Sequence, residues 1–358
     1  EVFVSTLNRY QNHVKYHLVS NPESPSDRIF YEEESSTYLD ADNVILLKDG
    51  ASMLRTSEKD GYNHIYHLTF SGTLSQVTKG NWDVIDLYGI DEKKGTVFYS
   101  SSENGAINKT LYSIQWKGTD KKMLSAAAGY NDAEFAPGFN YFIRTSSSAN
   151  TVPTYALCDR TGKEFQVLEA NTALQQKFNN MNLSKKEFLQ VDGAAGKLNA
   201  WIMKPANFDP NKKYPTLVYC QGGPQSALTQ FFSTRWNFSL MAANGYIVVA
   251  PNRRGMPGWG TKWNEEISRD WGGQPMKDYL AATDFAKTLP YVDGERVAAV
   301  GASYGGYSVF MLAGIHENRF KTFIAHDGLF DMKSWYLTTE ELWFANWDLG
   351  SPWEKPQP

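Results

Sequence analysis

The sequence predicts part of a β-propeller followed by a doubly wound, mainly parallel α/β sheet. Three observations predict this fold: a hairpin pattern that repeats in the first half, a change to alternating strands and helices near residue 175, and a glycine-flanked serine after an apolar strand. A chain of 358 residues is also longer than one core usually needs, so two structural units are expected. We assign residues 1–175 to the propeller part and residues 185–358 to the α/β part.

The repeat is an aromatic side chain followed two positions later by an aliphatic one, and its copies begin at Tyr16, Tyr66, Tyr112 and Tyr155. The copies lie about 43 to 50 residues apart, and the last three are each followed by a glycine turn and a short apolar strand, so the unit is a hairpin. A propeller blade has four strands in about 40 to 50 residues, which gives about three to four blades. Since a stable propeller usually has more, we expect an incomplete one. The alternative is a sandwich of unrelated hairpins.

The hairpin pattern of the first half ends at the polar segment 171–182. Apolar strands then alternate with helical patterns, as in a parallel sheet that is covered by helices on both faces. The expected strands are 200–204, 216–219, 246–250, 296–300 and 323–326, and the expected helices are 234–243, 275–289 and 304–313.

The segment Gly301-Ala302-Ser303-Tyr304-Gly305-Gly306 joins an apolar strand to an apolar helix. A G-x-S-x-G pattern in this place is typical of the nucleophile elbow of α/β hydrolases, where glycines make room for a strained turn. We therefore predict Ser303 as the nucleophile. The backbone N–H of Tyr304, at the positive end of the following helix, is the first predicted oxyanion donor.

A second oxyanion donor is expected in the loop after strand 216–219, where Gln221 precedes the Gly222-Gly223-Pro224 segment. Gln221 can donate through its side-chain amide or its backbone N–H. The alternative for Gln221 is a loop amide that faces water. Tyr219 is the fallback donor.

Five segments carry a family resemblance: D-G-Y-N-H-I-Y at 60–66, W-I-M-K-P-A-N-F at 201–208, G-G-P at 222–224, G-Y-I-V-V-A-P-N-R-R-G at 245–255 and G-A-S-Y-G-G-Y at 301–307. Together they resemble the prolyl oligopeptidase family, particularly its dipeptidyl peptidase (dipeptidyl peptidase IV-like) branch in Bacteroidetes-type bacteria. Many members have Tyr or His where Gln221 stands, so a phenol-based oxyanion hole is not carried over.

The resemblance implies a serine exopeptidase that releases N-terminal dipeptides from short peptides through an acyl-enzyme at Ser303. It also implies a ring-lined pocket formed by Phe330, Trp335 and Tyr336, together with Tyr304, and a propeller that admits only short peptides. The alternative for each of these rings is ordinary core packing. A periplasmic or secreted location and a homodimer of the full-length protein are further expectations. The alternatives are an acylaminoacyl peptidase or esterase with the same elbow, and a propeller interaction protein with a dead hydrolase domain.

In that family the triad Asp and His follow the serine by more than the roughly 55 residues between Ser303 and Pro358. We therefore expect a fragment that lacks both partners and is inactive by itself. The local candidates for a substitute base are His326, Asp327, Asp331 and Asp348. We expect His326 and Asp327 to lie in the pocket wall instead.

Two charged groups invite binding roles. A dipeptidyl peptidase needs carboxylates for the substrate's free amine. The segment 31–34, Tyr-Glu-Glu-Glu, is similar to the acidic amine-binding motif of that family. In the family the acidic motif lies further before the segment that corresponds to residues 60–66 than residues 31–34 do here. We therefore expect a solvated strand edge or loop at 31–34 and an amine anchor upstream of residue 1. Arg253 and Arg254 either contact a substrate anion or, more commonly, brace loops through nearby acids, for which Glu265, Glu266 and Asp270 are the candidates.

Composition excludes several other classes. A net charge of -4 with 42% hydrophobic residues argues against disorder and against nucleic-acid binding. Two distant cysteines, Cys158 and Cys220, give neither a disulfide framework nor metal-ligand spacing, and no apolar run is long enough for a membrane span. No metal or organic cofactor is implied.

Overall fold

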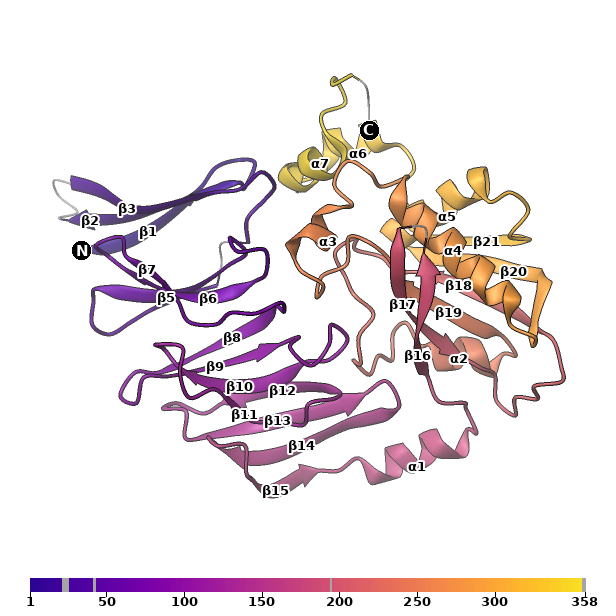
Figure 1. Ribbon diagram of the computed structural model, residues 1–358, viewed down its shortest axis with the longest axis horizontal. Coiled ribbons are helices and arrows are strands. Elements are labelled where there is room, and N and C mark those ends of the chain that lie inside the picture. Colours follow the sequence, from indigo (N-terminus) through magenta and orange to yellow (C-terminus); the bar gives the residue numbers. More distant parts are fainter. Residues whose placement is uncertain (21–25, 41–42, 194, 356–358) are drawn as a thin grey trace.

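The structure is a computed structural model that describes residues 1–20, 26–40, 43–193 and 195–355. Within these residues, four antiparallel sheets follow one another from the N-terminus, and a six-stranded mixed sheet with flanking helices comes after them. Figure 1 shows the four small sheets along one side of the molecule and the α/β unit along the other. The predicted fold class is confirmed, and a sandwich of hairpins is not formed.

The four small sheets correspond to the four copies of the sequence repeat. Each four-stranded sheet is a meander whose strands pair in chain order, and the repeat tyrosines lie on its third strand. The strands are β1 (Val2–Leu7), β2 (His13–Ser20) and β3 (Ser26–Glu34) in the first sheet; β4 (Val44–Leu46), β5 (Ser52–Ser57), β6 (His64–Thr69) and β7 (Leu74–Gln76) in the second; β8 (Val84–Asp91), β9 (Thr96–Ser101), β10 (Thr110–Gln115) and β11 (Lys122–Met123) in the third; and β12 (Tyr130–Phe135), β13 (Tyr141–Ser148), β14 (Thr151–Asp159) and β15 (Glu164–Glu169) in the fourth.

The last strand of each sheet is more exposed than the sequence suggested. We expected short apolar strands there, but every residue of β15 is exposed and β11 has only two residues, both exposed. These strands lie at the sheet edge, where one face and one hydrogen-bonding side remain open. The apolar residues of the hairpins are buried one strand further in, as at Leu111 on β10 and Ala156 on β14.

The C-terminal unit is built on a six-stranded sheet in the order β16-β17-β19-β18-β20-β21. Strands β18, β19, β20 and β21 are parallel to one another, and β16 and β17 are antiparallel additions at one edge. The bounds are β16 (Glu187–Gly193), β17 (Gly196–Met203), β18 (Tyr214–Cys220), β19 (Ile247–Asn252), β20 (Val292–Ala302) and β21 (Thr322–His326), with helices α1 (Thr172–Asn180), α2 (Phe238–Ala243), α3 (Thr261–Glu265), α4 (Gln274–Thr288), α5 (Tyr304–Ile315), α6 (Met332–Thr338) and α7 (Leu342–Leu349).

Helices cover both faces of this sheet, because successive strand residues are apolar on both sides. In β19, Val248 packs in the cluster that contains α2, whereas Val249 packs in the cluster that contains the end of α4. Helices α4 and α5 share a third cluster with Val218 and Val297 of the central strands. The elbow between β20 and α5 is therefore held in a packed core.

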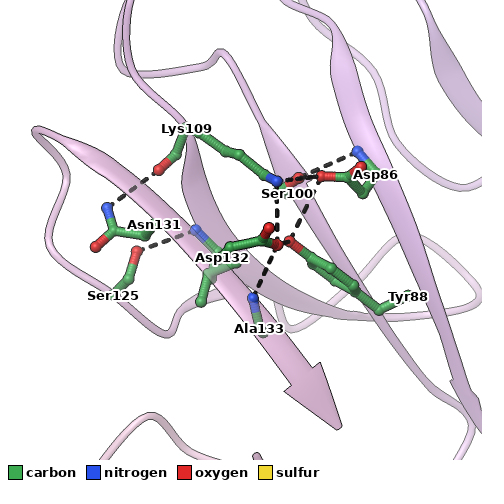
Figure 2. A network of polar contacts seen from close by, with 9 residues as sticks. Asp86, Tyr88, Ser100, Lys109, Ser125, Asn131, Asp132 and Ala133 are labelled. Atoms are coloured by element: carbon green, nitrogen blue, oxygen red, sulfur yellow. Dashed lines mark hydrogen bonds and ion pairs between the residues drawn. The ribbon is translucent and has the colours of Figure 1, made fainter. Parts of the chain in front are cut away.

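Neighbouring propeller sheets are joined by an ion-pair network around Lys109 (Figure 2). The Lys109 ammonium lies 2.7 Å from Asp86 Oδ2 on β8 and 3.0 Å from Asp132 Oδ1 on β12. Tyr88 donates to Asp132 Oδ1 at 2.6 Å, and Ser100 donates to Asp86 Oδ2 at 2.7 Å. The network ties the third sheet to the fourth.

The propeller part and the α/β unit contact each other at several places along the chain. Thr37 donates to Glu265 Oε1 at 2.7 Å, and the Gly61 carbonyl accepts the Thr261 N–H at 2.9 Å. Near the C-terminal end, the Trp347 indole donates to the Tyr10 carbonyl at 2.7 Å. The two units therefore form one body with an interface between them.

Candidate active site

Ser303 lies at a strained turn between β20 and α5. Its φ of 58° and ψ of -123° are unfavourable for a residue with a Cβ, and its side chain is exposed. The turn is also crowded, because a Cβ on Gly301 would lie 2.5 Å from the Gly305 carbonyl oxygen, and one on Gly305 would lie 2.1 Å from that of Cys220. This is the geometry of a nucleophile elbow, with the glycine requirement that the sequence predicted.

The Tyr304 N–H opens helix α5 and donates to no acceptor among the described residues. The first N–H groups of a helix lack partners within the helix, so this donor is available to an oxyanion beside Ser303. The Tyr304 ring points elsewhere. It is fully buried, its hydroxyl donates to the Trp271 carbonyl at 3.2 Å, and the Arg253 guanidinium lies 4.4 Å from the ring centre. Tyr304 therefore does not supply a ring to the substrate pocket, because its side chain belongs to the core.

Gln221 follows β18 in the loop beside the elbow. A Cβ on the next residue, Gly222, would lie 3.6 Å from Ser303 Cβ, so the loop lies against the nucleophile. The Gln221 side-chain amide donates to Ser226 Oγ at 3.1 Å. Its role as second oxyanion donor stays a prediction. Tyr219 is buried and packs on Phe238 of α2, so the structure does not support it as the fallback donor.

The three predicted pocket rings do not come together around Ser303 in the described residues. Phe330 is 82% exposed and contacts Phe310. Trp335 packs on Trp271 within the core cluster, and Tyr336 is buried near Trp353. Helix α6 turns the Trp335 and Tyr336 side chains toward α7 and the core, whereas Phe330 precedes this helix. Their role in substrate binding stays a prediction.

None of the predicted substitute bases contacts the Ser303 hydroxyl among the described residues. The His326 carbonyl accepts the Ser303 N–H at 3.0 Å, but its exposed imidazole pairs with Asp327 at 2.9 Å. Asp331 caps helix α6, and buried Asp348 accepts from the Trp271 indole at 2.8 Å. Burial raises the pKa of Asp348 above its ordinary value. These acids have structural partners.

A cavity of about 580 Å³ lies between the two units and is lined by residues from both. Gln221 and Trp236 border it from the α/β unit, whereas Glu58 and Asp83 border it from the propeller part. Lys186, just before β16, supplies the positive charge. Because Gln221 belongs to the loop after β18, the cavity reaches the loop that lies against Ser303. Another cavity, of about 630 Å³, is lined only by residues of the propeller part.

Two carboxyl groups of this cavity resist ionisation. Burial, followed by the negative charges of Asp83 and Glu265, raises the pKa of Glu58 to about 7. Burial also raises the pKa of Asp83, although its carboxylate accepts the Asn63 N–H at 2.9 Å. Glu58 is nevertheless an exposed residue at the edge of the cavity, so solvent moderates this effect of burial. Sequence reasoning missed both residues, because nothing in their local pattern sets them apart from other loop acids.

The expectation of a solvated strand edge at residues 31–34 changes in detail. Glu32 is solvated as expected and pairs with His13, but Glu33 forms an ion pair with buried Arg55 at 2.9 Å. The solvated-edge prediction is wrong for Glu33, because its side chain turns toward the next sheet.

The arginines after β19 are braces. Arg254 pairs with Glu266 at 3.0 Å and with Asp278 at 2.7 Å, and Arg253 is buried and donates to the Pro224 carbonyl at 3.0 Å. The loop-bracing alternative is therefore confirmed for Arg254 with Glu266, one of its predicted partners. Asp278, its other partner, was not predicted.

No helix of the described part is long and apolar enough to cross a membrane. No cluster of three metal-ligating side chains occurs in the described ranges either.

Comparisons with known proteins assign both units. Residues 232–358 match the prolyl oligopeptidase family, and residues 1–153 match the dipeptidyl peptidase IV N-terminal region. The chain is 42% identical over 317 residues to dipeptidyl-peptidase 5 of Porphyromonas gingivalis, and 59% identical over 160 residues to dipeptidyl-peptidase 5 of Porphyromonas endodontalis. These matches cover 86% and 44% of this chain, respectively.

Two solved structures are similar to this chain over almost its whole length. The crystal structure of Porphyromonas gingivalis dipeptidyl peptidase 4 matches with a TM-score of 0.89 and 33% identity over 98% of this chain. A putative dipeptidyl aminopeptidase IV from Bacteroides ovatus matches with a TM-score of 0.84 and 26% identity, also over 98%.

The matches cover only part of each relative. The chain spans 45% of the Porphyromonas gingivalis dipeptidyl-peptidase 5, 23% of the Porphyromonas endodontalis protein, and 49% and 52% of the two crystallised chains. It is thus partial relative to these proteins. With an elbow serine, a propeller part of the dipeptidyl peptidase IV type and these relatives, the chain belongs to the prolyl oligopeptidase family.

Proposed function

We propose that the full-length protein is a serine exopeptidase that releases N-terminal dipeptides from short peptides through an acyl-enzyme at Ser303. The observation that carries this proposal is the elbow itself. Ser303 is exposed, strained and flanked by a free helix N–H, and a purely structural serine needs none of these features. The relatives named as dipeptidyl peptidases support the choice of reaction.

The chemistry proceeds in two steps. Ser303 Oγ attacks the carbonyl carbon of the second substrate residue, and the resulting oxyanion accepts a hydrogen bond from the Tyr304 N–H. The tetrahedral species collapses, the amine of the remaining peptide leaves with a proton, and the dipeptidyl group stays on Ser303 as an ester. Water then hydrolyses the ester. The proton relay is the task of the family's His and Asp, since no described base contacts Ser303.

The cavity supports short substrates. Its volume of about 580 Å³ is within the range of sites that enclose small ligands, and the propeller forms one of its walls. The Glu58 and Asp83 carboxyls on that wall favour the cationic end of a peptide, because a nearby cation lowers their raised pKa values and stabilises their ionised forms.

The test is labelling with a fluorophosphonate probe and turnover of dipeptidyl chromogenic substrates by the full-length protein. We expect labelling in the wild type and none in Ser303→Ala, with a loss of at least about 10³-fold in kcat/KM. Substrates with a free amine should be cleaved and their N-acetylated forms should not. Cleavage of the acetylated forms alone would make the protein an acylaminoacyl peptidase, and a full-length protein that is never labelled would have a dead hydrolase domain.

We also propose a periplasmic or secreted location and a homodimer for the full-length protein. Both proposals rest on the family resemblance. Cell fractionation tests the first, and light scattering of the purified full-length protein tests the second.

A further inference from the structure

Lys186 is held in place immediately before β16 by a single amide side chain. Asn150 of the propeller part donates through Nδ2 to the Lys186 carbonyl at 3.1 Å and accepts the Lys186 N–H through Oδ1 at 2.8 Å. This two-point contact fixes the backbone where the chain enters the α/β unit. The Lys186 side chain therefore starts from a fixed point on the cavity wall.

The Lys186 ammonium has no anionic partner among the described residues. Its neighbour Glu187 is already paired, because Lys204 Nζ lies 2.7 Å from Glu187 Oε1. Among the residues that the structure describes, the Phe232 ring lies near the ammonium, with its centre 6.0 Å away. Burial alone lowers the pKa of Lys186 to about 8, and no nearby carboxylate contributes. At neutral pH the cavity therefore contains an enclosed, largely protonated and uncompensated cation.

Enclosing a cation without a counter-ion costs free energy, so an anion that enters the cavity recovers that cost. The cavity carboxyls do not supply the anion. Asp83 accepts the Asn63 N–H, and neither Asp83 nor Glu58 forms an ion pair with Lys186. The counter-ion must therefore arrive with the ligand.

The cavity has charges of both signs, with Glu58 and Asp83 from one unit and Lys186 near the start of the other. A short peptide with free ends also has both charges, an ammonium on the part that is acylated onto Ser303 and a carboxylate on the part that leaves. A long peptide places its C-terminal carboxylate outside a space of this size. Complementarity of charge thus favours peptides of a few residues.

We propose that Lys186 binds a carboxylate on the leaving part of the peptide substrate and so selects short or acidic peptides. This inference rests on the proposed peptidase function. The carboxylate comes either from the C-terminus of a peptide of three or four residues or from an acidic side chain after the cleaved bond. A charge-assisted contact of this kind discriminates by roughly 10-fold or more.

The experiment compares kcat/KM of the full-length protein for matched tripeptides that end in a free carboxylate or in an amide. An amidated peptide with Asp after the cleaved bond forms a further arm. We expect the wild type to favour the free acid by about 10-fold or more, and Lys186→Met to abolish the preference mainly through KM. Lys186→Arg should keep part of it. Lys185→Met, which removes the adjacent exposed lysine, is the matched control and should behave as the wild type.

Each outcome decides a separate question. If the wild type cleaves both peptides equally and the Asp peptide no better, Lys186 does not bind a carboxylate and the inference fails. A preference confined to the Asp peptide identifies the acidic side chain as the source. If the wild type releases no dipeptide from any of them, the proposed function fails first. Binding of the free-acid tripeptide to full-length Ser303→Ala, measured by calorimetry with and without Lys186→Met, tests recognition independently of turnover.

Discussion

Two lysines of this chain are enclosed by protein, and their surroundings differ in one respect. Lys109, between two propeller sheets, has two carboxylate partners and a tyrosine and a serine that bind those carboxylates (Figure 2). Lys186, at the interface cavity, has an aromatic ring nearby and no ion-pair partner in the part of the chain that the structure describes. Burial alone would lower the pKa of both lysines, but Asp86 raises that of Lys109, whereas that of Lys186 falls to about 8.

The difference separates charges that hold the fold together from charges that are left open for a ligand. A compensated charge such as Lys109 stabilises the junction that it joins, although its net contribution is modest. An uncompensated charge such as Lys186 costs stability and persists where a function requires it. Removing each charge in turn tests whether the two lysines have these different roles.

The largest effect is expected from Lys109→Met. The variant leaves Asp86 and Asp132 side by side without the cation that both contact. Breaking a buried pair costs roughly 3 to 5 kcal/mol, and since these two carboxylates are half exposed we expect about 2 to 3 kcal/mol. Thermal unfolding of the full-length protein measures the loss. If Lys109→Met unfolds at the wild-type temperature, the network does not stabilise the junction and the contrast with Lys186 disappears.

Much of the fold was predictable, because it depends on local pattern. The aromatic repeat at Tyr66, Tyr112 and Tyr155 located one hairpin in each of three sheets, since alternation and glycine turns are properties of short segments. The elbow was equally local, because the crowding at Gly301 and Gly305 follows from the strand-to-helix turn.

The cavity was not predictable, because its charges meet only through tertiary structure. Glu58 is adjacent in sequence to Ser57 and Lys59, and no local signal shows that it faces Asp83 across a loop or that an α3 residue, Glu265, lies near enough to raise its pKa. The partner of Glu33 was missed for the same reason, since Arg55 comes from the next sheet. The role of Phe330 in substrate binding, which the family resemblance implied, stays a prediction, and its ring contacts Phe310 in this chain.

A smaller effect is expected from Glu58→Gln. The pKa of Glu58 is raised from 4.5 to about 7, so the folded state holds this proton more tightly than the unfolded state does. Stability is therefore lost as the pH rises from about 4.5 to about 7, and the loss is complete above that range. Glutamine carries no charge, so Glu58→Gln should unfold at a temperature about 2 °C higher than the wild type at pH 8 and at an equal temperature near pH 4.5.

The control for Glu58 is Lys59→Gln, which changes an exposed neighbour. A wild type and a Glu58→Gln variant whose melting temperatures differ by the same amount at pH 4.5 and pH 8 would show that Glu58 has an ordinary pKa. In that case the negative wall of the cavity is ionised throughout this range.

The smallest effect is expected from Lys186→Met on stability, as distinct from its effect on substrate choice. Removing an enclosed, unpaired cation should leave stability equal or raise it by roughly 1 kcal/mol, the opposite sign to Lys109→Met. Because the pKa of Lys186 falls from 10.5 to about 8, the cost of its charge is full below pH 8 and fades between pH 8 and 10.5, where the folded protein has released the proton and the unfolded chain has not. The melting-temperature difference between Lys186→Met and the wild type should therefore be largest at pH 7 and vanish toward pH 10, with Lys185→Met unchanged at both. A loss of stability in Lys186→Met at pH 7 would mean that this lysine has a structural role like that of Lys109. The protein itself would then compensate the positive charge of the cavity, and the inference of a ligand carboxylate would fail.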